Sequence, residues 1–438
     1  MKSELTGILL ITVDCLRHDV VGSLGKTGNT PNIDKLAKKS VVFRQAIANG
    51  PGTPQSFPSI FTSTYALMHG SLFLSRKYIT LAEVLRGNGF ITIGLHSNPF
   101  LSRFFGYDRG FTYFEDFSKS ELSFLLNTQR GVKSILLTPL KSILKYTSFR
   151  KLMNRIFLSK KGYNVPYLRA EKLTKITLNW LERVRKHKFF LWIHYMDPHQ
   201  PYLPPIEWLD RLDPKDVLDI NKKLYSLRKS KKDKEFIKEI RYLYELEVKY
   251  VDSHIGILLE YLEGSGLLEK TLVILTADHG EAFFEHGECG HPAHLLYEEL
   301  IHVPLIIYNG EENARYVDKV VELIDIAPTV LETFRIQKPK DFIGMNLFNS
   351  LKTGAISETA KYSFNNFKYD FNSKIISFRT KKWKIIVKPS KHIVELYNLE
   401  KDPLELQNVA SENKDLVKEL LHVINRHTLL EKIRQIIM

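Results

Sequence analysis

The sequence has few cysteines and no long apolar run, and both shortages narrow what the protein can be. Only two of its 438 residues are cysteine, Cys15 and Cys289, and neither belongs to a Cys-x-x-Cys pair. Two thiols cannot build a disulfide framework, so they favour a reducing compartment. The first apolar run, residues 7–13, stops at Asp14 and is too short for a signal-peptide core or a membrane span. We therefore expect a cytoplasmic protein without a transmembrane segment.

Acidic residues are also in the minority, and the net charge is +14 at pH 7. Such an excess predicts an anionic partner. No RNA-binding signature, zinc-finger spacing or heptad-linked basic region accompanies the charge, so we expect no nucleic-acid partner. A small anionic substrate is the preferred interpretation, and peripheral contact with a membrane surface is the weaker alternative.

Short apolar runs alternate with helical patterns along the chain. Runs that are hydrophobic on both faces are typical of buried parallel strands, and they cover residues 8–13, 91–95, 189–196, 272–275 and 303–308. Helical patterns separate them at residues 31–40, 80–88, 169–186 and 245–263. This alternation predicts an α/β fold with a doubly wound, mostly parallel sheet flanked by helices.

Three regions of the chain differ in how their apolar and charged residues are arranged. Residues 1–335 form the expected catalytic α/β domain, and residues 336–438 a small C-terminal α+β subdomain with strands at 374–380, 383–388 and 392–397 and a helix at 413–438. Within the first domain, residues 118–240 read as a basic helical insertion or cap, with lysine-rich helical patterns at 134–161 and 222–238. Solvated helices covering the sheet are the plain interpretation. A cap that steers an anionic substrate and a membrane-surface helix are the alternatives.

Polar residues with metal-binding or acid–base chemistry follow the expected strands. In doubly wound sheets, ligands bind beyond the carboxyl ends of the strands, and the residues there are Asp14, Asp197, His199, Asp278 and His279. Asp278 and His279 can both turn towards one ion, because Gly280 permits a tight turn. Taken singly, each is equally well explained as a polar strand-end or turn residue.

Ser56 lies between a Gly/Pro-rich stretch and an expected helix. Residues 50–55 contain too much glycine and proline to be helical, whereas residues 60–67 read as a helix. Ser56 would then lie near a helix N-terminus, where free amides attract anions and a cation can turn a hydroxyl into a nucleophile. Helix capping is the alternative role for Ser56 and for Ser59.

Histidines cluster within residues 285–294, at His286, His291 and His294. Their density indicates metal binding, anion contact or acid–base work, although no thiolate pair of a standard zinc site accompanies them. Taken singly, each is best explained as a hydrogen-bonded loop residue.

The order of these motifs resembles the sulfatase family of the alkaline phosphatase superfamily. The segments that carry the resemblance are Thr12-Val13-Asp14-Cys15, Thr30-Pro31-Asn32, Ser56-Phe57-Pro58-Ser59, Asp197-Pro198-His199-Gln200-Pro201-Tyr202, Thr276-Ala277-Asp278-His279-Gly280-Glu281, Gly290-His291 and Tyr297-Glu298-Glu299. They span most of the chain outside the basic helical region.

The resemblance implies a metal-dependent hydrolase of sulfate esters. It implies that one divalent cation is bound by Asp14, Ser56, Asp278 and His279, and that Ser56 is the nucleophile. It also implies that His199 contacts the ester oxygens or protonates the leaving group, with His291 as a second contact. The substrate would be an anionic ester, with sulfated carbohydrate among the candidates.

Three departures from the family pattern leave alternatives open. Cys15 stands where many sulfatases have a second aspartate, which resembles the phosphonate monoester hydrolase branch and leaves Ca²⁺, Mg²⁺, Mn²⁺ and Zn²⁺ as candidates. Ile60 stands in place of the arginine of the Cys/Ser-x-Pro-x-Arg motif, so we predict that Ser56 is not converted to formylglycine. The Lys-x-His element that often follows the nucleophile is not evident.

Two other functions therefore remain alternatives to sulfate-ester hydrolysis. One is a phosphodiesterase, phosphonate monoester hydrolase or phospho-group transferase of the same superfamily. The other is a catalytically idle member that binds anionic glycans.

Overall fold

An eight-stranded sheet forms the centre of the protein, as the computed structural model shows for residues 4–25, 28–117, 158–159, 162–163, 165–226, 233–311 and 314–437. The strand order is β12-β2-β11-β8-β1-β7-β3-β4. These strands are β1 Gly7–Val13, β2 Val41–Ile47, β3 Ile91–His96, β4 Tyr113–Asp116, β7 Phe189–Tyr195, β8 Thr271–Ala277, β11 His302–Asn309 and β12 Arg315–Glu322. Only β11 is antiparallel to its neighbours. The predicted mostly parallel sheet is confirmed.

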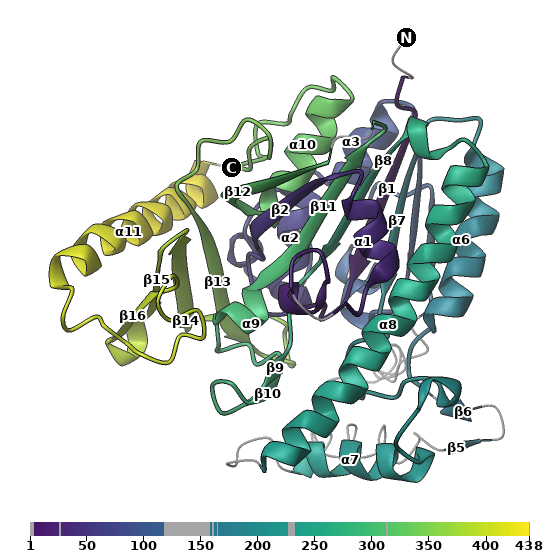
Figure 1. The fold of residues 1–438 in the computed structure, drawn as a ribbon. Coiled ribbons are helices and arrows are strands. Elements are labelled where there is room, and N and C mark those ends of the chain that lie inside the picture. The colour runs from purple at the N-terminus through teal and green to yellow at the C-terminus, as the bar shows by residue number, and fades with distance from the viewer. Residues whose placement is uncertain are drawn as a thin grey trace, which may run out of the picture.

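Helices cover both faces of this sheet (Figure 1). On one face lie α1 Pro31–Ala37, α6 Ala170–Val184 and α8 Lys234–Gly264, and on the other lie α2 Thr53–Thr62, α3 Leu81–Gly87 and α10 Ile326–Thr333. The structure also describes two further helices in the main unit, α7 Pro214–Ser226 and α9 Glu298–Ile301. Because helices cover both faces, every residue of β1, β7 and β8 is buried. This explains why these strands are apolar without alternation.

The central three strands are in register, and this aligns their ends. Val13 of β1 lies opposite Tyr195 of β7 and Ala277 of β8. The residues that follow β1 and β8, Asp14 and Asp278, therefore emerge side by side at one edge of the sheet. Gly280 is required just beyond, because a Cβ atom there would lie 2.1 Å from the carbonyl oxygen of Glu299.

Helix α2 covers Thr53–Thr62, so the expectation holds for residues 50–52 and 60–62 but was wrong for residues 53–55, which are helical, and for residues 63–67, which lie beyond the helix. Pro54 lies in the first turn, where the N–H that it lacks would be unpaired in any case. Pro58 lies inside the helix and cannot donate to the carbonyl of Pro54. The hydroxyl of Tyr369 donates to that carbonyl instead, at 3.1 Å, and so compensates for the lost bond.

A four-stranded antiparallel sheet follows the main unit, with the order β13-β14-β15-β16. Its strands are β13 Gly354–Tyr362, β14 Tyr369–Thr380, β15 Trp383–Lys388 and β16 Ile393–Asn398, and α11 Lys414–Ile437 packs on it. The predicted α+β subdomain is confirmed, whereas its boundary at 335/336 stays a prediction. Strand β13 was not predicted, because Ser357, Glu358 and Thr359 interrupt its apolar pattern although all three are buried.

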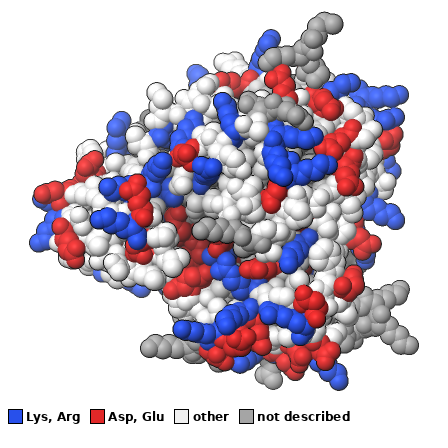
Figure 2. All heavy atoms as spheres, viewed as in Figure 1, with Lys and Arg blue, Asp and Glu red and all other residues white. Residues whose placement is uncertain are grey.

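The basic helical region is only partly described. The helix expected over 134–161 lies outside the described residues apart from β5, Leu158–Ser159, which pairs with β6, Gly162–Tyr163. In Figure 2 the lower part of the visible face, over α7 and the adjoining end of α8, carries Lys and Arg interleaved with Asp and Glu. Among the helices that the structure describes, none is long and apolar enough to cross a membrane.

Candidate functional site

Four strands direct polar groups to the same edge of the sheet. Asp14 follows β1, Asp278 and His279 follow β8, and Asn98 follows β3. Asp14, Asp278 and His279 are fully buried, and Asn98 is nearly so. Strand β2 leads through a short loop to Thr53 at the start of α2, which reaches the same place.

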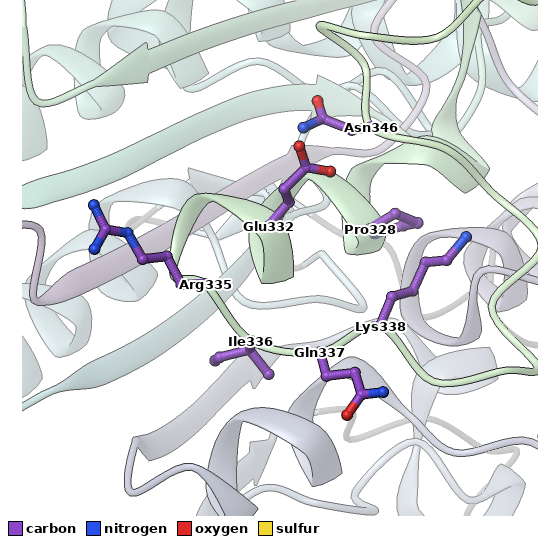
Figure 3. A pocket seen from close by; sticks show the side chains of 7 residues that line it. All are labelled: Pro328, Glu332, Arg335, Ile336, Gln337, Lys338 and Asn346. Atoms are coloured by element: carbon purple, nitrogen blue, oxygen red, sulfur yellow. The ribbon is translucent and has the colours of Figure 1, made fainter.

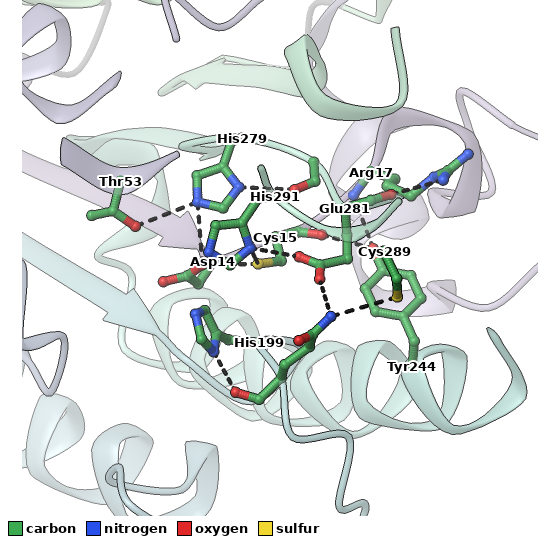
Figure 4. Close-up of polar contacts among 12 residues, drawn as sticks. Asp14, Cys15, Arg17, Thr53, His199, Tyr244, His279, Glu281, Cys289 and His291 are labelled. Carbon is green, nitrogen blue, oxygen red and sulfur yellow. Dashed lines mark hydrogen bonds and ion pairs between the residues drawn. The ribbon is translucent and has the colours of Figure 1, made fainter. Parts of the chain in front are cut away.

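Four side chains surround a point that suits a cation, and Figure 4 draws three of them, Asp14, Thr53 and His279. Thr53 Oγ1 donates to Asp278 Oδ2 at 2.8 Å and lies 3.4 Å from His279 Nε2. The same nitrogen is 3.6 Å from Asp14 Oδ1 and 3.5 Å from Asp278 Oδ2. Neighbouring ligands of a divalent ion have separations of about 3–3.5 Å when the metal–ligand bonds are about 2.0–2.4 Å long. The donor set of two carboxylates, an imidazole and a hydroxyl therefore fits one divalent cation.

The hydroxyl in this group belongs to Thr53 and not to Ser56. Asn98 Nδ2 donates to Asp14 Oδ2 at 2.9 Å and to Thr53 Oγ1 at 3.3 Å, which ties the threonine to the carboxylates. Ser56 lies one turn further into α2 and is fully buried, and no described group forms a hydrogen bond with its Oγ. Ser59 is likewise fully buried, and no described group forms a hydrogen bond with its Oγ. The structure thus brings Asp14, Asp278 and His279 together as predicted, but it does not bring Ser56 to them.

The pKa values of the two buried carboxylates are shifted in opposite directions. Burial raises the pKa of Asp14, but the hydrogen bond from His194 Nε2 at 3.1 Å and the nearby His199 and His279 outweigh it and lower the pKa well below its usual range. Burial raises the pKa of Asp278, and the charge of Asp14 adds to the increase. Asp14 is thus held as an anion, and Asp278 is able to accept a proton.

His199 and His291 lie beside this group. The ring centroids of His291 lie 4.7 Å from His279 and 5.0 Å from His199. Burial lowers the pKa of His199. Burial also lowers that of His291, but the adjacent Glu281 outweighs it and raises the pKa above the usual value.

Three other candidates lie apart from the site. His286 Nδ1 is 2.7 Å from Glu299 Oε1, and His294 Nε2 is 2.9 Å from Glu288 Oε1, so both are hydrogen-bonded loop residues. Asp197 is 3.7 Å from Arg169 Nη1 and does not contact the cation ligands.

Sequence reasoning missed Thr53 as a primary site residue, and it missed Asn98, His194 and Glu281 altogether. The position of Asn98 after a predicted strand was an available signal. His194 lies inside β7 and touches Asp14, and nothing in an apolar run marks one histidine as functional. Glu281 accepts hydrogen bonds from the hydroxyl of Tyr202 at 2.7 Å and the amide of Gln200 at 3.1 Å, which hold it beside His291.

A separate surface depression lies along the end of α10 (Figure 3). It has a volume of about 480 Å³ and is lined by Pro328, Glu332, Arg335, Ile336, Gln337, Lys338 and Asn346. None of the candidate site residues lines it.

Comparison with known families identifies two matches along the chain. The family model described as "Sulfatase" matches residues 7–336, and the model described as "N-sulphoglucosamine sulphohydrolase, C-terminal" matches residues 285–432. Arylsulfatase K of Mus musculus is 32% identical over 195 residues, which cover 42% of this chain and 35% of the mouse protein. The chain thus aligns with about a third of that relative. An arylsulfatase of Clostridium perfringens is 25% identical over 96% of this chain and 92% of its own length.

Solved structures share the fold over nearly the whole chain. A phosphonate monoester hydrolase of Agrobacterium radiobacter superimposes with a TM-score of 0.75 at 20% identity, covering 98% of this chain and 96% of that one. A protein solved in complex with its substrate D-glucosamine-2-N,6-O-disulfate superimposes with a TM-score of 0.73 at 17% identity, covering 98% of each chain.

Proposed function

The chain belongs to the sulfatase family, as its motifs predict, and on that premise we propose that it is a metal-dependent hydrolase of sulfate esters and closely related anionic esters. The observation that carries the proposal is the buried group of Asp14, Thr53, Asp278 and His279, whose donor atoms are spaced as ligands of one cation. Sulfated carbohydrate is the proposed substrate class, and the cytoplasm the proposed location.

Thr53 is the proposed nucleophile in place of Ser56. A divalent cation held by the four side chains would lower the pKa of the hydroxyl and offset the negative charge of the ester. Thr53 Oγ1 already donates to Asp278, which accepts the proton when the oxygen attacks. Asn98 holds the same oxygen and limits the directions in which it can point.

The proposed reaction has two steps. Thr53 Oγ1 bonds to the central sulfur or phosphorus atom and gives its proton to Asp278, while the bond from that atom to the alcohol oxygen breaks and the departing alcohol takes a proton from His199. Water then cleaves the threonyl ester and restores the hydroxyl. His199 and His291 complete the site on the side of the ester oxygens.

Thr53 favours phosphate and phosphonate esters as a second candidate substrate class. Threonine carries a methyl group on Cβ and cannot be oxidised to the aldehyde of formylglycine. Sulfate cannot then leave by collapse of an aldehyde hydrate, so water must hydrolyse a threonyl ester, as in phosphatase chemistry. Ser56 stays predicted to be unmodified, which the intact mass of its peptide would test.

Turnover of p-nitrophenyl sulfate, p-nitrophenyl phosphate and p-nitrophenyl phenylphosphonate tests the proposal. The protein is stripped with a chelator and assayed with Mg²⁺, Ca²⁺, Mn²⁺ or Zn²⁺ restored one at a time. We expect hydrolysis of at least one ester that depends on the added metal. The faster ester distinguishes the two substrate classes. If no ester is hydrolysed with any metal, the catalytically idle alternative holds.

A further inference from the structure

The loop that carries His199 has its two ends joined by one guanidinium group. The loop comprises residues 197–203 and follows β7. Arg169 stands just before the first turn of α6, and its Nη1 lies 3.7 Å from Oδ1 of Asp197 at the start of the loop. Its Nη2 donates to the backbone carbonyl of Leu203 at the end of the loop, at 2.5 Å. His199 lies between these two fixed points.

Glu247 of α8 holds the same end of the loop. It is fully buried, its Oε1 accepts from the backbone N–H of Leu203 at 2.8 Å, and its Oε2 lies 3.4 Å from Arg169 Nη1. The ring centroids of Tyr167 and Tyr250 each lie 5.9 Å from Cζ of Arg169, and only 16% of the Arg169 side chain is exposed. A guanidinium that is paired, covered and bonded to the backbone has little freedom to move. Arg169 and Glu247 together form the loop clamp.

The shape of this loop sets the direction of the His199 ring. Nδ1 of His199 is 2.5 Å from the backbone carbonyl oxygen of Gln200 (Figure 4), so the peptide that follows the histidine orients the ring. With Nδ1 bonded in this way, Nε2 is the nitrogen left to give a proton to an ester oxygen. A catalytic group displaced by about 1 Å can lose about 10²-fold in rate. The position of the Gln200 carbonyl therefore matters, and the clamp fixes the backbone on both sides of it.

We propose that Arg169 and Glu247 are positioning residues for the ester hydrolysis: by holding both ends of residues 197–203, they aim the His199 ring at the oxygen of the departing alcohol. This inference rests on the proposed function, in which His199 supplies the proton for that alcohol. Among the contacts of the described residues, neither clamp residue touches a cation ligand, so both act through the loop. Loss of the clamp should therefore resemble a weakened general acid. The rate loss should grow as the alcohol becomes a weaker acid, because a poorer leaving group depends more on the proton.

Two esters with different leaving groups test this dependence. Arg169→Lys keeps the positive charge but cannot reach both ends of the loop, since an ammonium lacks the fork of a guanidinium. With the ester type that the wild type hydrolyses best, we expect kcat to fall by about tenfold for p-nitrophenol and by about 10²-fold for phenol, the weaker acid. Arg109→Lys is the matched control, since Arg109 has 17% of its side chain exposed and donates to the backbone carbonyls of Ser75 and Tyr78, outside the candidate site. It should change both rates by the same factor.

Further variants separate positioning from a merely structural role. His199→Ala removes the proton donor, so adding Arg169→Lys to it should lower kcat by less than about twofold more. Glu247→Ala should show the same leaving-group dependence as Arg169→Lys. Glu247→Gln should keep nearly wild-type rates: burial raises the pKa of Glu247 to about 8, so an uncharged side chain suits the position, and the amide oxygen still accepts from Leu203. If Arg169→Lys folds poorly, the two Glu247 variants carry the test.

Hydrogen exchange gives a readout that needs no activity. The peptide that covers residues 197–203 should exchange faster in Arg169→Lys than in the wild type, and at the wild-type rate in Arg109→Lys. Unchanged exchange in Arg169→Lys, equal rate losses with both esters, or losses that add to that of His199→Ala would each overturn the proposal. A wild type that hydrolyses no ester would overturn the proposed function as well. The two failures are distinct, because the second is seen in the wild type alone and the first only in the variants.

Discussion

Thr53 and Ser56 lie three residues apart on α2, and this separation decides which hydroxyl reaches the candidate site. Both side chains are hydroxyls on α2 and both are buried. Only Thr53, in the first turn, reaches the carboxylate of Asp278, whereas Ser56 lies a turn further along the helix. A nucleophile must lie within bonding distance of the group that activates it, so the geometry favours Thr53.

Replacing Thr53 should therefore stop turnover. We expect Thr53→Ala to lower kcat by about 10³-fold or more, because the nucleophile and one cation donor are lost together. Ser56→Ala, the matched hydroxyl deletion, should leave kcat within a few fold, and Thr53→Ser should keep part of the activity. Steady-state kinetics with the best ester measure all three. Loss of activity in Ser56→Ala with Thr53→Ala still active would restore Ser56 as the nucleophile.

Replacing Asn98 should lower the catalytic rate more than it lowers the stability of the fold. Its amide donates to both Asp14 and Thr53, so Asn98→Ala frees the proposed nucleophile, Thr53, to rotate. We expect kcat to fall by roughly 10²-fold, as happens when one positioned donor is removed from an active site. Asn88→Ala, at an exposed helix end, is the control. An unchanged kcat in Asn98→Ala would show that the amide has no part in positioning Thr53.

Among the helices, the N-terminus of α1 has an unusual cap. Thr30 occupies the N-cap position, but its side chain caps no amide. Asp252 of α8 accepts instead from the backbone N–H groups of Ile33 at 2.8 Å and Asn32 at 3.1 Å. Because the amides of a first turn have no partner within their own helix, this contact joins two helices that are far apart in sequence.

Removing that cap should loosen the packing of α1 on α8. We expect Asp252→Ala to lower the free energy of unfolding by about 2 kcal/mol, at the upper end for a lost cap because the amides would be left unpaired away from water. Asp415→Ala, at a fully exposed aspartate, should change it by less than about 0.5 kcal/mol. Urea unfolding followed by circular dichroism would measure both. Equal stabilities of the two variants would contradict the capping role.

In the whole molecule, a buried charge cluster joins the C-terminal sheet, α11 and the main unit. Glu358 of β13 lies 2.8 Å from Lys374 Nζ and 3.6 Å from His427 of α11, and it accepts from the backbone N–H of Leu67 at 3.3 Å. Lys374 also contacts Glu431 of α11 at 2.9 Å. Burial raises the pKa of Glu358, but Lys374 and His427 outweigh it and hold the pKa at about 2.

The lowered pKa predicts how acid affects stability. A carboxyl whose folded pKa lies below its usual value contributes stability above about pH 4.5, and this is lost as the pH falls towards 2. Glu358→Gln should therefore lower stability at pH 7 by about 3 kcal/mol, since Lys374 loses its shorter ion pair. The deficit should shrink below pH 4.5. Thermal melts from pH 2 to 7 measure how the stability deficit depends on pH. Glu419→Gln, at an exposed glutamate of α11, is the control. A deficit of Glu358→Gln that does not vary with pH would refute the prediction.

The sequence by itself determined the sheet and most of the residues at its edge. Apolar runs of strand length ending at Asp14 and at Asp278-His279 predict parallel strands whose ends meet, and the register of β1 with β8 confirms that they do. These features are local: a buried strand needs apolar side chains on both faces, and a strand end is marked by the first polar residue.

Tertiary structure alone decided which hydroxyl reaches the carboxylates. The start of α2 is supported by Tyr369, 315 residues from Pro54 along the chain, and no local pattern records that bond. Strand β13 was missed because Lys374 and His427 neutralise its buried Glu358 from other elements. His199 and His291 likewise come from separate loops. Distances between such side chains depend on how packed elements place them, so only the folded chain could show them.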